Sequence, residues 1–270
     1  MTILFLIQAI LLIAAALCVI MAGAWLLQRR TGNSGWVDTT WTFGLGAVGI
    51  AAALVPLPAA AAPNARQVIL AMLVLAWALR LGLHIAIRSA AIGDDPRYAR
   101  LAQDWGRDAP RRMFVFLQQQ ALGSVPLALA IFVAAQVPLA PLRMQDFVGF
   151  GILLIGLAGE MVADSQLRDF RNDPANRNRI IDTGLWRFSR HPNYFFQWFG
   201  WLAYPVIATD LSGQYPFGWL ALLGPAVMYW VLRYATGVPH LERHLERTRG
   251  DTFRAHQARV NLFFPGPRKR

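Results

Sequence analysis

Charged residues and cysteine are scarce in this sequence of 270 residues. Asp, Glu, Lys and Arg make up only 15% of the chain, against roughly 25% in an ordinary soluble domain. The only cysteine, Cys18, lies in an apolar run, which excludes a disulfide within the chain and a cysteine-based metal site. Hydrophobic residues reach 56%, and no polar interval between Thr2 and Gly237 is long enough for a separate soluble core. The composition therefore predicts a single membrane domain over residues 1–270, without a metal site.

Seven segments are apolar enough to cross a hydrocarbon core, which takes about 20 helical residues. They cover residues 3–27, 37–61, 68–87, 114–135, 147–163, 195–208 and 217–235, and the sixth is the shortest. Prolines between them, such as Pro56 and Pro58 after the second, are typical helix breakers. This pattern predicts an all-α integral membrane fold of seven transmembrane helices.

Basic residues gather in alternate connections between these segments. Arginines follow the first, third, fifth and seventh segments, whereas only Arg66, Arg80 and Arg143 lie clearly away from that side. Because cytoplasmic loops are enriched in Lys and Arg, we expect an outside N-terminus and a cytoplasmic C-terminus. The net charge of +11 is then explained by contact with anionic membrane lipids, and no motif for nucleic acid accompanies it. The lack of organelle targeting signals favours a bacterial inner membrane.

A few ionisable residues lie inside the apolar segments, where they are costly unless paired or hydrated. Arg80 lies near the middle of the third segment, and Glu160 and Asp164 stand four apart near the end of the fifth. Residues with this spacing share one helical face. The acid pair predicts either a local ion-pair stripe with Arg168 or the polar wall of a cavity. Asp38, which opens the second segment, is either an N-cap or a functional group.

The connection between the fifth and sixth segments is rich in groups that suit an anion. Six arginines lie between Arg168 and Arg190, and guanidinium groups bind phosphate oxygens through two parallel charge-assisted hydrogen bonds. The Arg-His-Pro-Asn-Tyr sequence of residues 190–194 follows, and its Pro192 can start a helix whose free N–H groups favour an anion. The amphipathic tail, residues 242–256, is either a surface-lying helix or part of the same site.

Several stretches resemble one known family. TGLWRFSRHPNYFFQW at residues 183–198 closely resembles a signature of the steroid 5-alpha-reductase-like superfamily, in particular of its bacterial branch of unknown function, the DUF1295 type. VDTTWTFGLG at 37–46, WALRLGLHIAIR at 77–88 and GDDPRYARL at 93–101 are similar to the same branch, as is the tail. Together they span most of the chain. The chain is also distantly similar to isoprenylcysteine carboxyl methyltransferases.

The resemblance implies a seven-helix membrane reductase that holds NADPH in a cavity at the cytoplasmic side, within residues 160–270. Such an enzyme saturates an activated carbon–carbon double bond, and its substrate is a lipophilic enone that enters from the bilayer. By matching position, the resemblance places these residues at the cofactor: Asp164, Arg168, Arg171, Arg179, His191, Asn193, Tyr194, Trp201, Glu242 and His256.

Proton transfer is assigned less directly. We expect Tyr98, from the Asp-Pro-Arg-Tyr motif, to be the proton donor, since a phenol can donate to an enolate oxygen; Asp38 is the alternative polar group. The sequence departs from the family at one point. Steroid-acting members hold the substrate carbonyl with a Gln-Glu pair in the second helix, whereas Thr-Phe-Gly-Leu-Gly follows Trp41 here. The resemblance therefore does not extend to the steroid-binding pair.

Two other functions fit the same architecture. Membrane methyltransferases that act on isoprenylcysteine or phospholipid amines bind S-adenosylmethionine with a similar His-Pro turn and a C-terminal glutamate, and His191 and Glu242 would serve there too. The third possibility is a non-enzymatic lipid-binding protein of the same fold. The density of arginines in one loop favours a cofactor that carries phosphates, and so NADPH.

Overall fold

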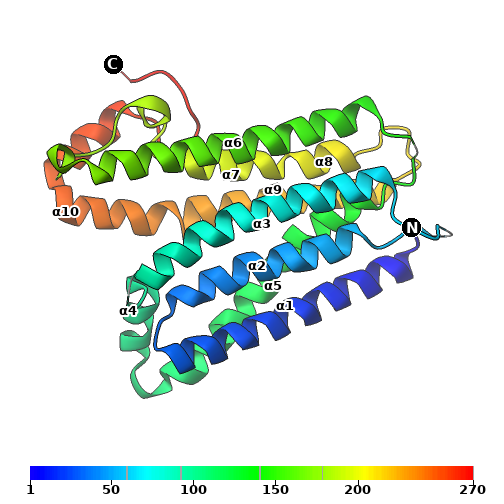
Figure 1. Cartoon of the computed structure of the whole chain (residues 1–270), viewed down its shortest axis with the longest axis horizontal. Helices are drawn as coiled ribbons and strands as arrows, with labels where there is room; N and C mark the ends of the chain where they lie inside the picture. Colours follow the sequence, from blue (N-terminus) through cyan, green and yellow to red (C-terminus); the bar gives the residue numbers. More distant parts are fainter. Residues whose placement is uncertain (59, 92, 140, 178, 270) are drawn as a thin grey trace.

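The protein is a bundle of helices. The computed structural model describes residues 1–58, 60–91, 93–139, 141–177 and 179–269, and this part of the chain contains no strand (Figure 1). The long helices are α1 (Ile3–Thr31), α2 (Gly35–Ala53), α3 (Ala65–Ala91), α5 (Ala109–Ala135) and α6 (Met144–Asn172). The shorter ones are α4 (Pro96–Trp105), α7 (Pro192–Trp201), α8 (Ala203–Ala208), α9 (Leu223–Trp230) and α10 (Val238–Arg259).

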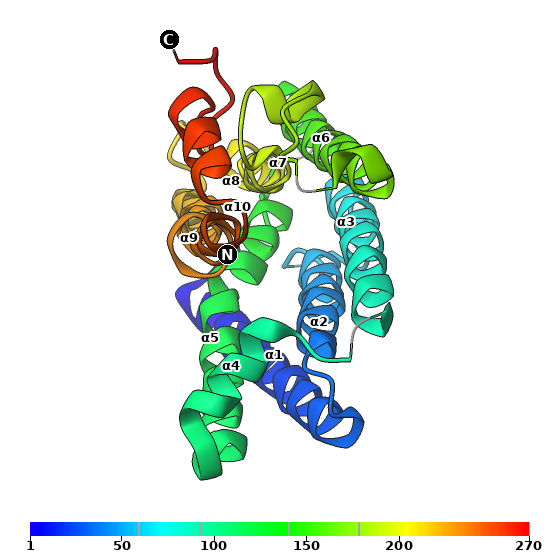
Figure 2. The ribbon, with the colours of Figure 1, turned by 90° about the vertical axis from the view of Figure 1, so that its left-hand side faces the viewer.

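The helices run along the long axis of the molecule, and the two chain ends lie at opposite ends of it (Figure 1). Seen along that axis, α6 and α7 lie together in the upper part of the bundle, and α1, α4 and α5 lie in the lower part (Figure 2). Helices α4 and α10 lie at the end where α3 and α6 finish. The long helices thus bring residues from distant parts of the sequence together at that end.

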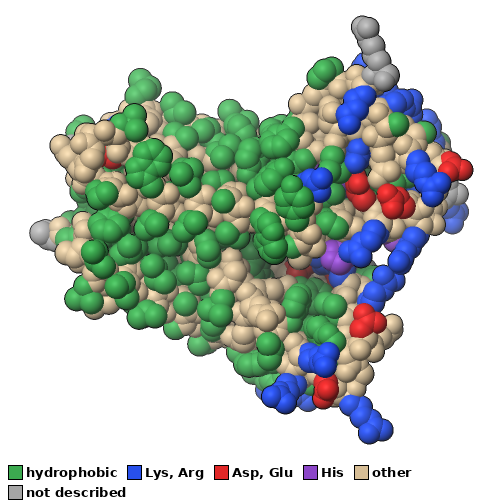
Figure 3. Space-filling model, turned by 180° about the vertical axis from the view of Figure 1, so that it is seen from behind, with side chains coloured by type: hydrophobic (Ala, Val, Ile, Leu, Met, Phe, Trp, Pro, Cys, Tyr) green, Lys and Arg blue, Asp and Glu red, His purple; other side chains and the backbone are tan. Residues whose placement is uncertain are grey.

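The surface has the character expected of a membrane protein. Among the described residues, four helical units are long and apolar enough to span a membrane: α1, α3, the α4–α5 unit Pro96–Ala135, and α6. Their outward side chains include Leu12, Val19 and Ile87, each more than 70% exposed. Apolar side chains cover most of the visible face, and charged ones gather at the end that holds α4 and α10 (Figure 3). The predicted all-helical membrane fold is confirmed to this extent.

Helix bounds differ from the predicted segments where proline intervenes. The second segment ends at Ala53 instead of residue 61, before Pro56 and Pro58; residue 59 lies outside the described part of the chain. The sixth is divided into α7 and α8, because Pro205 has no N–H to donate to the carbonyl of Trp201. The seventh combines a 3₁₀ stretch, α9 and a π-helical turn at Val231–Ala235. Helix α6 is longer than predicted and carries its polar residues on to Asn172.

Two of the three arginines that lie off the basic side share one buried carboxylate as their ion-pair partner. Asp146, at the start of α6, is 0% exposed and accepts hydrogen bonds from Nε and Nη2 of Arg66, both at 2.9 Å. Arg66 also donates to the carbonyl oxygens of Val137 (3.1 Å) and Leu139 (2.8 Å). Arg143 donates to Asp146 at 3.2 Å through its side chain. This cluster fixes the starts of α3 and α6 against each other at the end opposite the charged surface.

Candidate functional site

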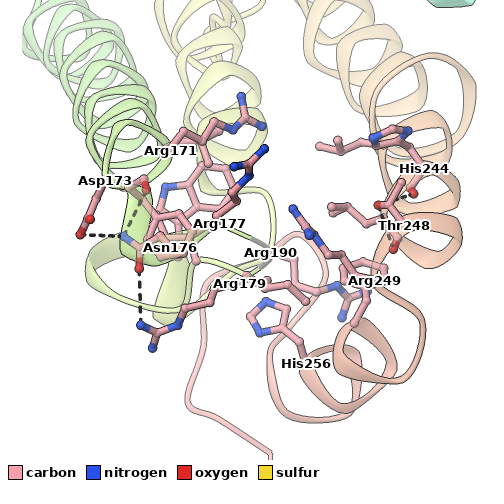
Figure 4. A pocket seen from close by; sticks show the side chains of 18 of the residues that line it. Arg171, Asp173, Asn176, Arg177, Arg179, Arg190, His244, Thr248, Arg249 and His256 are labelled. Atoms are coloured by element: carbon pink, nitrogen blue, oxygen red, sulfur yellow. Dashed lines mark hydrogen bonds between the residues drawn. The ribbon is translucent and has the colours of Figure 1, made fainter.

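A cavity of about 630 Å³ lies at the charged end of the bundle. One side is formed by the end of α6 and the loop after it, and the other by α10 (Figure 4). Its size falls within the range of about 300 to 1,000 Å³ that is usual for small-molecule sites. Its polar lining includes Arg171, Asn172, Asp173, Asn176, Arg177, Arg179, Arg190, His191, His244, Thr248, Arg249 and His256.

The cavity is strongly basic. Arg171, Arg177 and Arg179 form no ion pair with any residue that the structure describes, and Arg179 donates a hydrogen bond to the neutral Asn176 at 3.5 Å. Asp173 is the acidic residue among the described lining residues. Burial, followed by the charge of Arg190, lowers the pKa of His256 to about 4, so this imidazole is neutral at pH 7. Unpaired guanidinium groups around a hollow of this size suit a ligand with phosphate groups.

The loop before α7 is held in place from both sides. Gly184 has a φ of 58°, and a Cβ there would lie 2.5 Å from the side-chain oxygen of Gln166. That oxygen accepts a hydrogen bond from the Leu185 N–H at 2.9 Å, and Trp186 Nε1 donates to the Ala163 carbonyl at 3.0 Å. On the other side, Ser189 Oγ donates to the Phe263 carbonyl at 2.8 Å. The arginines of the loop therefore project from a backbone that α6 and the C-terminal segment both fix.

Glu242 of α10 organises the inner wall. Its carboxylate accepts hydrogen bonds from Arg190 Nε (2.7 Å) and Gln257 (3.2 Å), and lies 3.1 Å from His191 Nε2. Burial by itself would raise the pKa of Glu242, but the hydrogen bonds from His191 and Arg190 outweigh it and lower the pKa to about 2. Burial also lowers the pKa of His191. The pair is thus an ionised glutamate and a neutral histidine.

His191 offers an unused acceptor at the cavity wall. Because its Nε2 faces the ionised Glu242, that nitrogen carries the proton and Nδ1 is an acceptor. Nδ1 is buried and has no hydrogen-bond partner among the residues that the structure describes. Buried polar atoms are normally paired, and His191 lines the cavity. A ligand with a hydroxyl or amide donor would satisfy this atom.

Helix α10 folds over the cavity in two arms. Gly250 interrupts it with a φ of 48°, a left-handed value that favours glycine. The first arm presents Leu241, His244 and Thr248 to the cavity, and the second presents His256. The alternative that the tail is only a surface-lying helix does not account for these contacts.

A row of polar residues leads from the cavity into the bundle. Tyr194 stacks on His191 with ring centroids 5.5 Å apart. Asn193 donates to Asp164 at 3.1 Å, and Asp164 also pairs with Arg80 of α3. Arg80 lies 2.5 Å from Glu160 as well. Both acids of α6 therefore pair across to α3, and the local stripe with Arg168 that the spacing allowed does not form, because Arg168 turns back to Ser165.

Tyr98 and Asp38 form a second polar group, which joins α4 to α2. The Tyr98 hydroxyl donates to Asp38 at 2.8 Å, and Arg97 donates to the same carboxylate at 2.5 Å. Gln120 of α5 donates to the Tyr98 oxygen at 3.4 Å. The alternative that Asp38 is an N-cap is wrong, because α2 begins at Gly35 and its N-cap is Ser34.

The residues predicted at the cofactor fall into three groups. Arg171, Arg179, His191 and His256 line the cavity, and Glu242 binds two residues of its wall. Those of the second group, Asp164, Asn193 and Tyr194, lie on the polar row beside it. The third group lies apart from the lining of this cavity. Arg168 is exposed on α6, and Trp201 is buried against Trp77 at a ring-centroid distance of 6.0 Å.

Two residues of the cavity, Thr248 and Arg249, were not predicted from the sequence. A signal was present, because residues 241, 244, 245 and 248 repeat at the spacing of one helical face.

The comparisons with known proteins identify a family. The model of a family described as "Protein of unknown function (DUF1295)" matches residues 24–260, so the chain belongs to this family. No curated protein and no solved structure matches the chain.

Proposed function

We propose that this member of the DUF1295 family is an NADPH-dependent reductase of an activated carbon–carbon double bond in a lipophilic substrate. The observation that carries the proposal is the basic cavity, in which Arg171, Arg177 and Arg179 have no acidic partner among the described residues. NADPH carries three phosphate groups, and these would pair with the three guanidinium groups when the cofactor is bound. The resemblance to steroid 5-alpha-reductase-like proteins supplies the reaction class, as an analogy.

The proposal includes seven membrane crossings, with the N-terminus outside and the cavity in the cytoplasm, most simply of a bacterial inner membrane. Seven predicted segments fall on helices, and the chain ends lie at opposite ends of the bundle, as an odd number of crossings requires (Figure 1). Charged side chains gather at the cavity end (Figure 3). The positive-inside rule therefore supports this orientation.

The residues around the cavity fit a dinucleotide. The arginines would hold its phosphates, and the free Nδ1 of His191 would accept from a ribose hydroxyl or an amide. Asp164 and Asn193 would meet the end of the cofactor that reaches toward the bundle. The bound cofactor supplies a hydride to the β-carbon of the enone; a proton is added at the α-carbon, so the products are NADP⁺ and the saturated ketone.

Tyr98 remains the predicted proton donor, with Asp38 beside it. Its hydroxyl proton points at the Asp38 carboxylate, and Tyr98 is 4% exposed. In this arrangement the tyrosine holds Asp38 and joins α4 to α2. Proton donation from Tyr98 therefore requires its hydroxyl to turn away from Asp38 toward a substrate.

An S-adenosylmethionine-dependent methyltransferase is the second candidate, because such enzymes have a similar His-Pro turn and a C-terminal glutamate, and here Glu242 lies 3.1 Å from His191 Nε2. S-adenosylmethionine carries one carboxylate and no phosphate, so it offers fewer anionic groups than NADPH to Arg171, Arg177 and Arg179. A non-enzymatic protein that binds a phospholipid would supply one phosphate, against the three of NADPH. The charge of the cavity therefore favours NADPH.

Removing single arginines from the cavity should weaken NADPH binding. We expect Arg171→Ala and Arg179→Ala each to raise the Kd for NADPH about tenfold or more, since a hydrogen bond to a charged group contributes about 1.5 to 3 kcal/mol. The control is Arg254→Ala, whose guanidinium is 74% exposed and pairs with Asp251 outside the cavity. Kd is measured by isothermal titration calorimetry on protein in lipid nanodiscs. Equal affinities for all four proteins would contradict the proposal.

A further inference from the structure

Helices α6 and α7 carry two acid–amide pairs, one helical turn apart. Asp164 and Asn193, joined by a hydrogen bond of 3.1 Å, form the first pair. Glu160 and Gln197 form the second, four residues further from the charged end on each helix. Four residues of an α-helix rise about 6 Å. The second pair therefore lies about one turn deeper in the bundle than the predicted cofactor contacts.

Glu160 and Gln197 line a second cavity, between α3 on one side and α6 and α7 on the other. Its other walls are mainly apolar and include Trp77, Leu153, Leu157, Phe196 and Trp201. Helices α6 and α7 leave no space between themselves, because a Cβ on Gly156 would lie 2.8 Å from the Gly200 Cα. The cavity measures about 20 Å³, which is room for one water-sized group. It can receive the oxygen end of a molecule whose remainder is apolar.

Two hydrogen-bond donors in this cavity are unused. Gln197 accepts from Trp77 Nε1 at 3.2 Å, and its side-chain NH₂ has no hydrogen-bond partner among the described residues. Within the same described part of the chain, the hydroxyl of Tyr204 also has none. Gln197 is 8% exposed and Tyr204 is 4% exposed. The two donors are therefore available to an acceptor that enters this cavity. Glu160 does not compete for this place, because Arg80 already neutralises it at 2.5 Å.

We propose that this second cavity binds the carbonyl oxygen of the lipophilic substrate, through the Gln197 amide and the Tyr204 hydroxyl. This inference rests on the proposed reductase function, because it places the reacting end of the enone one turn from Asp164 and Asn193. Donors aimed at a carbonyl oxygen stabilise the negative charge that develops on it when the double bond is reduced. The apolar flanks of α3 and α6, where Leu79, Leu83, Met161 and Val162 are exposed, provide the substrate with a route from the bilayer.

The subsite also gives an alternative to Tyr98 as the group that meets the substrate. The Tyr98 proton is bound by Asp38, whereas the Tyr204 hydroxyl has no such partner in the part of the chain that the structure describes. The Gln-Glu pair that steroid-acting relatives place in their second helix is missing from α2. In this chain, the Gln197 amide of α7 and the Glu160 carboxylate of α6 line the second cavity instead.

The test compares two probes that differ only in the oxygen. One is cyclohex-2-enone carrying a dodecyl chain, and the other is dodecylcyclohexene, which lacks the carbonyl. Each is titrated into the full-length protein in nanodiscs, and Kd is obtained from the rise in thermal stability. We expect the native protein to bind the enone about tenfold more tightly than the hydrocarbon, the effect of one or two hydrogen bonds.

Two variants remove the donors with little change of shape. Tyr204→Phe removes only the hydroxyl, and Gln197→Met replaces the amide by an apolar side chain of similar length, which removes the NH₂ donor together with the oxygen that accepts from Trp77 Nε1. Both should abolish the preference for the enone. The matched control is Tyr215→Phe, whose hydroxyl donates to the Val133 carbonyl at 2.9 Å and lines neither cavity; it should keep the preference. No preference in the native protein, as for a cavity that holds only water, or a preference that survives in both variants, overturns the proposal.

Titration of the same samples with NADPH separates this inference from the reductase proposal. Arg179→Ala should lose NADPH affinity and keep the preference for the enone, whereas Tyr204→Phe should show the reverse. If the native protein keeps a Tyr204-dependent preference but does not bind NADPH, the reductase proposal fails and the ketone subsite stands. If NADPH binds and the preference is missing, the subsite alone fails.

Discussion

Replacing Asp146 by asparagine is expected to lower the free energy of unfolding by about 3 to 5 kcal/mol, the usual cost of breaking a buried ion pair by removing one partner. Asp146 is fully buried and receives two hydrogen bonds of 2.9 Å from Arg66, which is itself 2% exposed. The substitution leaves two guanidinium groups, those of Arg66 and Arg143, without their carboxylate. The chain then holds an uncompensated cation where α3 and α6 begin.

Unfolding in mixed micelles, followed by circular dichroism, measures this loss. The control is Asp251→Asn, whose carboxylate is 95% exposed and pairs with Arg254; exposed pairs contribute about 0 to 1 kcal/mol. The double substitution Arg66→Met with Asp146→Leu should recover part of the stability, because it removes the more deeply buried of the two guanidinium groups together with its partner, although Arg143 still lacks its carboxylate. An Asp146→Asn protein as stable as the control would show that water reaches this cluster.

Replacing Glu242 by glutamine is expected to lower the free energy of unfolding by about 2 to 3 kcal/mol at pH 7 and to weaken NADPH binding. The carboxylate holds Arg190 and His191 in the wall of the cavity, at 2.7 and 3.1 Å. Its pKa falls from 4.5 in the unfolded chain to about 2 in the folded one. A lowered carboxyl pKa stabilises the folded state above pH 4.5, and this stabilisation is lost as the pH falls toward 2.

The pH dependence distinguishes this charge effect from a loss of packing. The difference in stability between the native protein and Glu242→Gln should be largest above pH 4.5 and should shrink below it. The control is Glu246→Gln, one turn further along α10, where the carboxylate is exposed and accepts a hydrogen bond from Gln257 at 3.1 Å. A difference that is constant from pH 7 to pH 3.5 would contradict the role given to the ionised Glu242.

Apolar runs predicted the helices well, because the period and length of hydrophobic residues decide which segments leave water. They could not predict how the last two segments break. The division at Leu202 depends on a missing N–H at Pro205. The π-helical turn before α10 was not predicted either. The positive-inside pattern marked Arg66 and Arg143 as exceptions without showing that both pair with one buried carboxylate.

The basic loop was visible in the sequence as a density of arginines, but charge alone does not say which of them face a cavity. Arg171 and Arg179 line it, whereas Arg168 turns back along α6. Trp201 was placed at the cofactor by position in a motif, yet α7 carries it two turns into the bundle, against Trp77. In the sequence, Tyr204 looks like any aromatic residue of a transmembrane segment. Only the structure indicates that its hydroxyl has no hydrogen-bond partner among the described residues.

The most direct test of the reductase account is thermal unfolding of the native protein in nanodiscs with NADPH and, separately, with S-adenosylmethionine. A ligand at 100 times its Kd stabilises the folded state by about 2.7 kcal/mol, which such an experiment resolves easily. We predict stabilisation by NADPH, a smaller effect of NADH, which lacks the 2′-phosphate, and none by S-adenosylmethionine. Stabilisation by S-adenosylmethionine alone would contradict the account and favour the methyltransferase as the function.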